Sequence, residues 1–225
     1  MGMRLFGNLH GPYGPRACLS KVLAAFLFLA TPACAAQTTV LALGDSLTQG
    51  YGLPEAEGFV PQLAAWLDDH GAEARVINGG VSGDTSAGGA ARVAWSLTDE
   101  VDAMIVTLGG NDMLRGIDPA VTKGNLATIL DAAAARDVAV LLVGMRAPGN
   151  FGPDYKRAFD SLYRELAGAR DILFFEDFLK GLGEGTPDEL AEFLQPDGIH
   201  PNAAGVRRIV EAIGPAVLRL IEAAK

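Results

Sequence analysis

The stretch Thr39-Val-Leu-Ala-Leu-Gly-Asp-Ser46 decides the fold, because it runs from a short apolar segment into a glycine turn that ends in a serine. Apolar segments of the same kind recur at 75–78, 103–108, 138–143 and 172–175, and the first three of these also run into glycine. Continuous apolar runs of roughly four to eight residues are typical of strands that are buried on both faces, as in a parallel sheet. The sequence therefore predicts five parallel β-strands.

Between these segments, apolar residues recur at the spacing of one helical face, in the stretches 60–67, 126–133, 155–166 and 206–217. Asp118 and Pro119 are typical of a helix start, whereas Gly214-Pro215 is expected to break or kink the last helix. Strands that alternate with helices build βαβ units, and such sheets bind ligands beyond the carboxyl ends of their strands. We therefore expect an α/β fold with its site at that edge.

The first 36 residues have the pattern of a secretory signal. Basic residues precede an apolar run at 22–30, and small residues follow it, with Ala33-Cys-Ala35 as the cleavage motif. The run is shorter than the roughly 20 residues that span a bilayer. We expect a signal peptide at 1–36 that is cleaved near residue 35 or 36, a single domain at 37–225, and a periplasmic or secreted protein without a stable membrane anchor. An uncleaved anchor and a lipid on Cys34 are the alternatives.

The charge of the chain narrows the class of partner. The net charge is −9, and residues 1–36 hold three positive charges and no negative one, so the remainder carries −12. Nucleic acid and anionic membranes repel such a domain, and we expect a small-molecule ester substrate. Cys18 and Cys34 both lie in the predicted signal, which leaves the domain without disulfides or cysteine-bound metals. The sequence leaves the oligomeric state open between a monomer and a small oligomer.

Ser46 follows the first strand, where a hydroxyl can reach a substrate at the carboxyl edge of the sheet. A hydroxyl is a weak nucleophile until a base accepts its proton. Of the three histidines, His10 lies in the predicted signal and His70 at a helix end, whereas His200 lies in a polar turn three residues after Asp197. This spacing lets the carboxylate orient the imidazole, as in a Ser–His–Asp triad. The alternative is that these residues serve only the turns and caps in which they occur.

Acyl transfer also needs hydrogen-bond donors for the negative charge that develops on the carbonyl oxygen. Glycine loops offer accessible backbone N–H groups, and Gly83 lies in such a loop after the second strand. Asn111, after the third strand, adds a side-chain amide. The alternatives are a turn glycine at Gly83 and a loop cap at Asn111. We assign Asp45, Asp84 and Asp112 to the organisation of turns rather than to chemistry or to a metal site.

Four blocks, in this order, resemble the GDSL family, also called SGNH hydrolases. They are 44–52, 79–85, 108–112 and 197–202, which read GDSLTQGYG, GGVSGDT, LGGND and DGIHPN. The resemblance covers nearly the whole domain and looks closest to the bacterial arylesterase, thioesterase I and lysophospholipase L1 branch. It implies a three-layer α/β/α, flavodoxin-like fold with a five-stranded parallel sheet. It further implies Ser46 as nucleophile, His200 as base, Asp197 as its orienting carboxylate, and an oxyanion hole of Ser46 N–H, Gly83 N–H and Asn111.

We therefore expect a serine esterase that forms an acyl-enzyme on Ser46 without a cofactor or a metal. Aryl esters, short to medium acyl esters, acyl thioesters and lysophospholipids are its candidate substrates. Apolar residues after the third and fourth strands should border the cleft: Met113, Leu114, Ile117 and Tyr155. A carbohydrate O-acetylesterase of the same family is the alternative. A non-catalytic binding module is more remote, because the chain has neither a G-x-x-x-x-G-K-[ST] loop nor a G-x-G-x-x-G fingerprint after a strand.

Overall fold

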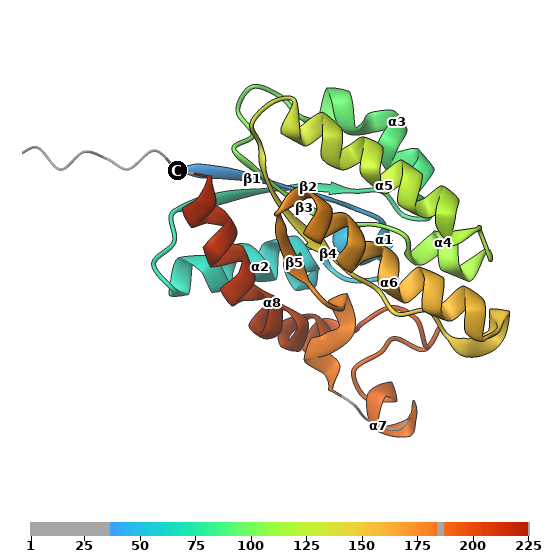
Figure 1. Cartoon of the computed structure of the whole chain (residues 1–225). Coiled ribbons are helices and arrows are strands. Elements are labelled where there is room, and N and C mark those ends of the chain that lie inside the picture. The colour runs from blue at the N-terminus through green and yellow to red at the C-terminus, as the bar shows by residue number, and fades with distance from the viewer. Residues whose placement is uncertain (1–36, 184–186, 225) are drawn as a thin grey trace, which may run out of the picture. The chain divides into compact units, whose positions relative to one another are not determined.

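The computed structural model describes residues 37–183 and 187–224, which form one five-stranded sheet with helices on both faces (Figure 1). The predicted signal peptide at 1–36 lies outside the described residues. The strands are β1 Thr38–Gly44, β2 Ala74–Gly80, β3 Ala103–Thr107, β4 Ala139–Val143 and β5 Leu173–Phe175. All neighbouring strands are parallel, in the order β2-β1-β3-β4-β5, which confirms the five predicted strands and their direction.

The longer helices in the described part of the chain form two layers. They are α2 Phe59–Asp69, α3 Ser86–Ser96, α5 Pro119–Ala134, α6 Pro153–Arg170 and α8 Ala203–Ala223. Helices α3, α5 and α6 cover one face of the sheet, and α2 and α8 cover the other (Figure 1). Within β1, Leu41 and Leu43 enter one core and Val40 and Ala42 the other. Side chains alternate in this way when a strand is buried between two layers, which confirms the three-layer α/β/α fold.

Short elements occupy the connections, several of them at the carboxyl ends of the strands: α1 Ser46–Gln49, η1 Glu55–Glu57, α4 Gly110–Leu114, η2 Gly149–Phe151, η3 Phe178–Leu182 and α7 Pro187–Ala191. The register aligns Gly44, the last residue of β1, with Gly80 of β2 and Thr107 of β3. The three loops that follow these strands therefore start side by side. The fold places them at the edge where parallel sheets bind ligands.

The helix ends agree with the sequence at α5 and differ from it at α8. Asp118 Oδ1 accepts the Ala120 N–H at 2.8 Å, and Pro119 is the first residue of α5, as predicted. Of the break or kink expected at Gly214-Pro215, the break is wrong, because α8 continues through Pro215, whereas the kink stays a prediction. An interior proline costs a helix about 3 kcal/mol, but the buried apolar face of α8, which includes Ile213 and Val217, outweighs this cost. Neither α8 nor any other described helix is long and apolar enough to cross a bilayer.

Candidate active site

Ser46 begins helix α1, two residues beyond the end of β1. Asp45 caps this short helix, because its Oδ1 accepts the Leu47 N–H at 3.0 Å. Ser46 is only 8% exposed and lines a cavity, so its hydroxyl lies in a recess of the surface. Its Oγ lies 2.9 Å from His200 Nε2, a distance at which the hydroxyl donates a hydrogen bond to the imidazole. The fold thus joins two residues that are 154 positions apart in the chain.

The loop that carries His200 is short and internally bonded. An antiparallel bridge between Leu194 and Pro201 closes it, and the Gln195 N–H donates to the His200 carbonyl oxygen at 2.7 Å. His200 Nδ1 lies 2.7 Å from Asp197 Oδ2. With its Nδ1–H donated to this carboxylate, the ring presents Nε2 as an acceptor to the serine hydroxyl. The geometry that the three-residue spacing predicted is therefore present.

The charge of Asp197 is stabilised by its own loop. The backbone N–H of His200, the backbone N–H of Ile199 and the His200 side chain lower the pKa of Asp197 to about 2. The side chain is 37% exposed, so water also solvates the carboxylate. The Tyr51 ring packs against the imidazole, with 4.6 Å between the ring centroids. Asp197 and Tyr51 together restrict the orientation of His200.

Gly83 and Asn111, the predicted oxyanion donors, line the same cavity as Ser46. Gly83 has a φ of +80°, in the left-handed backbone region that favours glycine. Arg115 Nη2 donates to the Gly83 carbonyl oxygen at 2.9 Å and so holds this loop against the end of α4. Asn111 Nδ2 donates to Asp45 Oδ2 at 3.3 Å, and the amide carries a second N–H for another acceptor.

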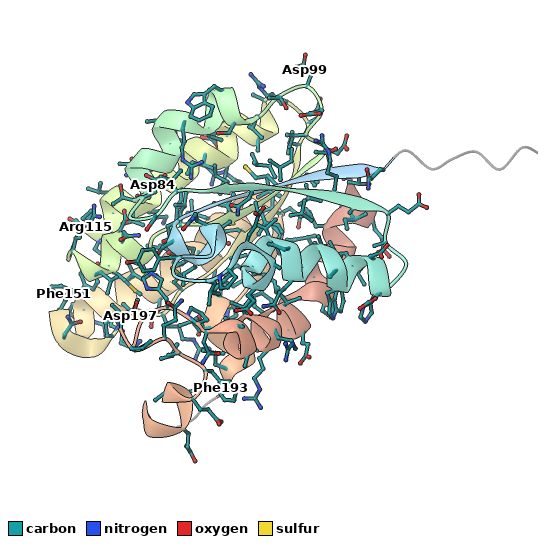
Figure 2. All side chains as sticks on the ribbon, turned by 180° about the vertical axis from the view of Figure 1, so that it is seen from behind. Asp84, Asp99, Arg115, Phe151, Phe193 and Asp197 are labelled. Carbon is teal, nitrogen blue, oxygen red and sulfur yellow. The ribbon has the colours of Figure 1, made fainter. Side chains whose placement is uncertain are left out.

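The structure therefore brings the predicted catalytic and oxyanion residues to one cavity from four segments of the chain: Ser46, Gly83, Asn111, and Asp197 with His200. Figure 2 shows the labelled residues Asp84, Arg115 and Asp197 on one side of the domain, away from Asp99. Asp84 and Arg115 adjoin the second and third of these segments. The segments come together because they follow the aligned carboxyl ends of the strands or precede α8.

Asp45 is the second carboxylate beside Ser46, and its environment differs from that of Asp197. The residue is 1% exposed, and this burial raises the pKa of the Asp45 carboxyl to about 6. Hydrogen bonds from the Leu47 N–H and from Asn111, and the charge of His200, act in the opposite direction but are outweighed by desolvation. Asp45 caps α1 and contacts the Asn111 amide, so it links the first and third sequence blocks.

The other two aspartates of the sequence blocks make buried or partly buried contacts with residues of α3 and α5. Asp84 Oδ2 accepts the Nε–H of Arg92 at 2.8 Å. Asp112 accepts the Ser86 N–H at 2.8 Å and the Thr122 hydroxyl at 3.1 Å, and so ties α4 to α3 and α5. Within the described residues, no group of three or more His, Cys, Asp or Glu side chains is arranged to hold a metal ion.

The cavity beside Ser46 has a volume of about 780 Å³, and two of the four predicted substrate contacts line it. Met113 and Leu114 line it, whereas Ile117 and Tyr155 do not. The Tyr155 hydroxyl instead donates to the Ile117 carbonyl oxygen at 3.0 Å, and the Tyr155 ring packs against the core. These two residues connect the start of α6 to the segment before α5 rather than bordering the cleft.

Much of the cavity wall comes from residues that the sequence analysis did not identify. They lie after β4 and β5 and before the His200 loop: Met145, Phe178, Leu179, Leu182, Leu190 and Leu194. The carboxyl-end rule also indicates 178–182 once it is applied to the fifth strand. Leu190 and Leu194 follow no strand, and the sequence carries no signal for their position at the cavity.

Known proteins match both the sequence and the fold. The GDSL-like lipase/acylhydrolase family matches residues 42–208. Esterase TesA of Pseudomonas aeruginosa is 40% identical over 196 residues, which are 87% of this chain and 94% of that protein. Thioesterase 1/protease 1/lysophospholipase L1 of Escherichia coli strain K12 is 36% identical over 178 residues, with 79% and 82% covered. A crystal structure of TesA has a TM-score of 0.74 and 38% identity, and covers 81% of this chain and 99% of that one.

The matched region includes every residue of the site described above, from Ser46 to His200. The similarity to the relatives extends over most of their own length, so it concerns the whole domain rather than one motif. The chain therefore belongs to the GDSL-like lipase/acylhydrolase family, the SGNH hydrolases, and is a carboxylic ester hydrolase.

Proposed function

We propose that the protein hydrolyses carboxylic esters through an acyl-enzyme on Ser46. The observation that carries this proposal is the pair of hydrogen bonds at 2.9 Å and 2.7 Å that runs from the Ser46 hydroxyl through His200 to Asp197. A serine hydroxyl becomes an effective nucleophile when an adjacent base accepts its proton. An imidazole oriented by a carboxylate is such a base.

In the first half-reaction, Ser46 Oγ attacks the ester carbonyl carbon while His200 Nε2 accepts the hydroxyl proton. Negative charge forms on the carbonyl oxygen, and the proposed donors to it are the Ser46 N–H, the Gly83 N–H and Asn111 Nδ2. His200 then protonates the leaving oxygen, the alcohol departs, and the acyl group stays on Ser46. Asp197 stabilises the imidazolium that forms.

In the second half-reaction, His200 accepts a proton from water while the water oxygen attacks the acyl carbon. The same three donors stabilise the second oxyanion. His200 then returns a proton to Ser46 Oγ, and the carboxylic acid leaves. No residue outside the triad and the three donors is required to balance the protons.

The cavity supports a substrate with an apolar acyl or aryl group. Its apolar wall residues include Met113, Leu114, Met145, Phe178 and Leu182. Its volume of about 780 Å³ lies within the range of roughly 300–1,000 Å³ that holds drug-sized ligands. An apolar wall suits a hydrocarbon chain or an aryl ring better than the hydroxyl groups of a sugar, so we favour aryl esters and longer acyl esters over acetylated carbohydrates. The names of the relatives add acyl thioesters and lysophospholipids as candidates.

Hydrolysis of p-nitrophenyl acetate, butyrate and octanoate by the wild type and Ser46→Ala tests the proposal. We expect Ser46→Ala to lower kcat by about 10⁴–10⁶-fold and to leave the circular dichroism spectrum unchanged. We also expect kcat/KM of the wild type to rise from acetate to butyrate. Turnover by Ser46→Ala at a tenth of the wild-type rate would contradict the acyl-enzyme. A preference for acetate would favour the O-acetylesterase instead.

We further propose that 1–36 is a cleaved signal peptide and that the domain at 37–225 acts in the periplasm or outside the cell. The support is the order of basic residues, apolar run and small residues in 1–36. Intact mass and N-terminal sequencing of the protein from the extracytoplasmic fraction test this. A mature N-terminus near residue 36 or 37 is expected, whereas a chain that still begins at residue 1 would contradict it.

A further inference from the structure

Arg92 is a buried charged side chain for which the catalytic scheme has no role. It lies on α3 and is 9% exposed. Its guanidinium group makes two hydrogen bonds with partners from different segments. Nε donates to Asp84 Oδ2 at 2.8 Å, and Nη2 donates to the Gly44 carbonyl oxygen at 2.8 Å. One side chain thus holds two loops at the carboxyl edge of the sheet.

Each of these two partners adjoins a proposed oxyanion donor. Asp84 directly follows Gly83, and Gly44 lies two residues before Ser46. The backbone N–H groups of Gly83 and Ser46 belong to different loops, so no single turn fixes how they lie relative to each other. The guanidinium group of Arg92 links the two loops, because it bonds Asp84 next to Gly83 and the Gly44 carbonyl oxygen near Ser46.

Backbone contacts tie the same two loops together. The Gly44 carbonyl oxygen also accepts the Val81 N–H at 3.1 Å, and the Val81 carbonyl oxygen accepts the Asp84 N–H at 3.0 Å. Helix α3 approaches Asp84 so closely that a Cβ atom on Gly88 would lie 1.6 Å from Asp84 Oδ1. Gly88 therefore makes room for the carboxylate that Arg92 binds.

Because this ion pair is buried, we expect it to fix the geometry of the two loops rather than to add much to the free energy of unfolding. The side chains of Arg92 and Asp84 are 11% and 12% exposed. Desolvation offsets much of the attraction in a buried pair, and replacing such pairs with apolar residues is often neutral or stabilising. A planar guanidinium, however, holds two acceptors in a fixed geometry, which a lysine ammonium does not.

We propose that Arg92, paired with Asp84, is a positioning residue that aligns the Gly83 and Ser46 N–H groups toward the substrate oxyanion. This inference rests on the oxyanion hole of the proposed function. Arg92 acts through the loop backbone and does not touch the substrate. Its loss should misalign donors that act in the transition state, so kcat falls while KM stays nearly constant.

Arg92→Lys and Asp84→Asn are the informative variants. Arg92→Lys keeps the charge but loses the planar pair of donors, and Asp84→Asn keeps an acceptor oxygen of the same shape but loses the charge. Arg75→Lys is the matched control, because Arg75 Nη2 bridges Glu100 at 2.6 Å and Thr39 at 3.4 Å at the other end of β1. All three are compared with the wild type in kcat and KM on p-nitrophenyl butyrate.

The second readout is the inhibition constant of an alkyl trifluoromethyl ketone. Ser46 Oγ would add to its carbonyl carbon while His200 takes the proton, which leaves an oxyanion on the former carbonyl oxygen. A non-electrophilic alcohol of the same chain length serves as the comparison ligand. A general loss of structure would weaken the binding of both ligands, whereas misaligned donors would weaken the binding of the ketone alone.

We expect Arg92→Lys to lower kcat by about 10–100-fold, less than or equal to the loss of one whole donor. KM and the inhibition constant of the alcohol should stay within about twofold of the wild-type values. The inhibition constant of the ketone should rise by the same factor by which kcat falls. Asp84→Asn should change the same parameters by a smaller factor, and Arg75→Lys should change none of them. Unchanged kcat in both Arg92→Lys and Asp84→Asn, or equal weakening of ketone and alcohol, would overturn the inference. Failure of the wild type to bind the ketone more tightly than the alcohol would instead overturn the proposed acyl-enzyme.

Discussion

Two aspartates, Asp45 and Asp197, lie close to the same serine, and their surroundings shift the pKa values of their carboxyl groups in opposite directions. Asp197 lies on an exposed loop, where two backbone N–H groups and the His200 side chain lower its pKa to about 2. Asp45 lies at the buried end of β1, where desolvation raises its pKa to about 6. The carboxylate that must remain charged beside an imidazolium is thus the one that water and backbone donors solvate.

The difference shows that position in the GDSL block does not assign a role. Asp45 is adjacent to Ser46 in the chain, yet its oxygens accept the Leu47 N–H and the Asn111 amide. Asp197 is 151 positions away from Ser46 in the sequence and contacts it only through His200. The first carboxylate contacts the proposed oxyanion donor Asn111, and the second contacts the proposed base His200.

The sharpest test of this contrast is Asp197→Asn. The amide oxygen of the new side chain can still accept the Ile199 and His200 backbone N–H groups, so the loop should persist. Its NH₂ group, however, cannot accept the Nδ1–H of the His200 ring. We expect kcat to fall by about 10³–10⁴-fold, as replacing the carboxylate of a triad does elsewhere. Steady-state kinetics with p-nitrophenyl butyrate measure this. A loss of less than tenfold in a folded variant would remove Asp197 from the triad.

Asp45→Asn should have a smaller effect on turnover. The amide oxygen of the new side chain would still cap Leu47, but its NH₂ group would face the NH₂ group of Asn111 and would turn the Asn111 amide away from the oxyanion. We expect kcat to fall by about tenfold with little change in KM, since misaligning a donor costs less than removing it. A loss as large as that of Asp197→Asn would mean that Asp45 takes part in proton transfer.

The same variant should change how stability depends on pH. The pKa of Asp45 is raised from 3.8 to about 6 in the fold, so folding favours the protonated carboxyl. The stability that Asp45 contributes is therefore fully present below pH 4 and is lost as the pH rises through 6. Asp45→Asn should gain stability over the wild type by up to about 3 kcal/mol between pH 4 and pH 7.

Urea unfolding of the wild type and Asp45→Asn at a series of pH values measures this gain. Asp197→Asn is the control, because its pKa is lowered and the sign is opposite. The charge of Asp197 stabilises the fold of the wild type above pH 4, and this stabilisation is lost as the pH falls toward 2. Asp197→Asn should therefore be less stable than the wild type above pH 4. A difference between Asp45→Asn and the wild type that stays constant with pH would contradict the raised pKa of the buried Asp45 carboxyl.

Arg115→Met should have the smallest effect in the series. Arg115 bonds the Gly83 carbonyl oxygen from an exposed position, whereas Arg92 holds the neighbouring Asp84 from a buried one. Exposed contacts of this kind contribute little because water replaces the lost donor. We expect kcat to fall by about two- to threefold, measured with the same ester. A larger loss than that of Arg92→Lys would move the positioning role to the exposed arginine.

Much of the site could be predicted because its signals are local. Asp197 and His200 lie three residues apart, and the Gly83 and Asn111 loops each follow an apolar strand directly. The rule that parallel strands present their carboxyl ends at one edge then joins the Gly83 and Asn111 loops to Ser46. The loop of Asp197 and His200 follows no strand, and it was joined to Ser46 by the need for a base and by the family resemblance. The five strands and helices α2, α5, α6 and α8 followed from hydrophobic spacing for the same reason, whereas α3 was not predicted and the three-layer arrangement came from the family resemblance.

The features that could not be predicted depend on contacts between residues that lie far apart in the sequence. Arg92 bonds a carbonyl oxygen 48 residues earlier in the chain, and its helix α3, which contains Gly88 and Gly89, was not among the predicted helices. The Tyr155 hydroxyl bonds the Ile117 carbonyl oxygen, 38 positions earlier in the chain, and Tyr155 does not line the cavity. Helix α8 continues through Pro215 because tertiary burial, which local propensity does not include, outweighs the lost hydrogen bond.

Covalent labelling tests the central claim, that His200 activates Ser46 as the nucleophile, most directly. The wild type, Ser46→Ala and His200→Ala are treated with an alkyl fluorophosphonate, and the modified peptide is identified by mass spectrometry. We expect one adduct per chain on Ser46 in the wild type, none in Ser46→Ala, and labelling slowed by at least about 10³-fold in His200→Ala. Stoichiometric labelling of another residue, or equal labelling of Ser46→Ala, would contradict it.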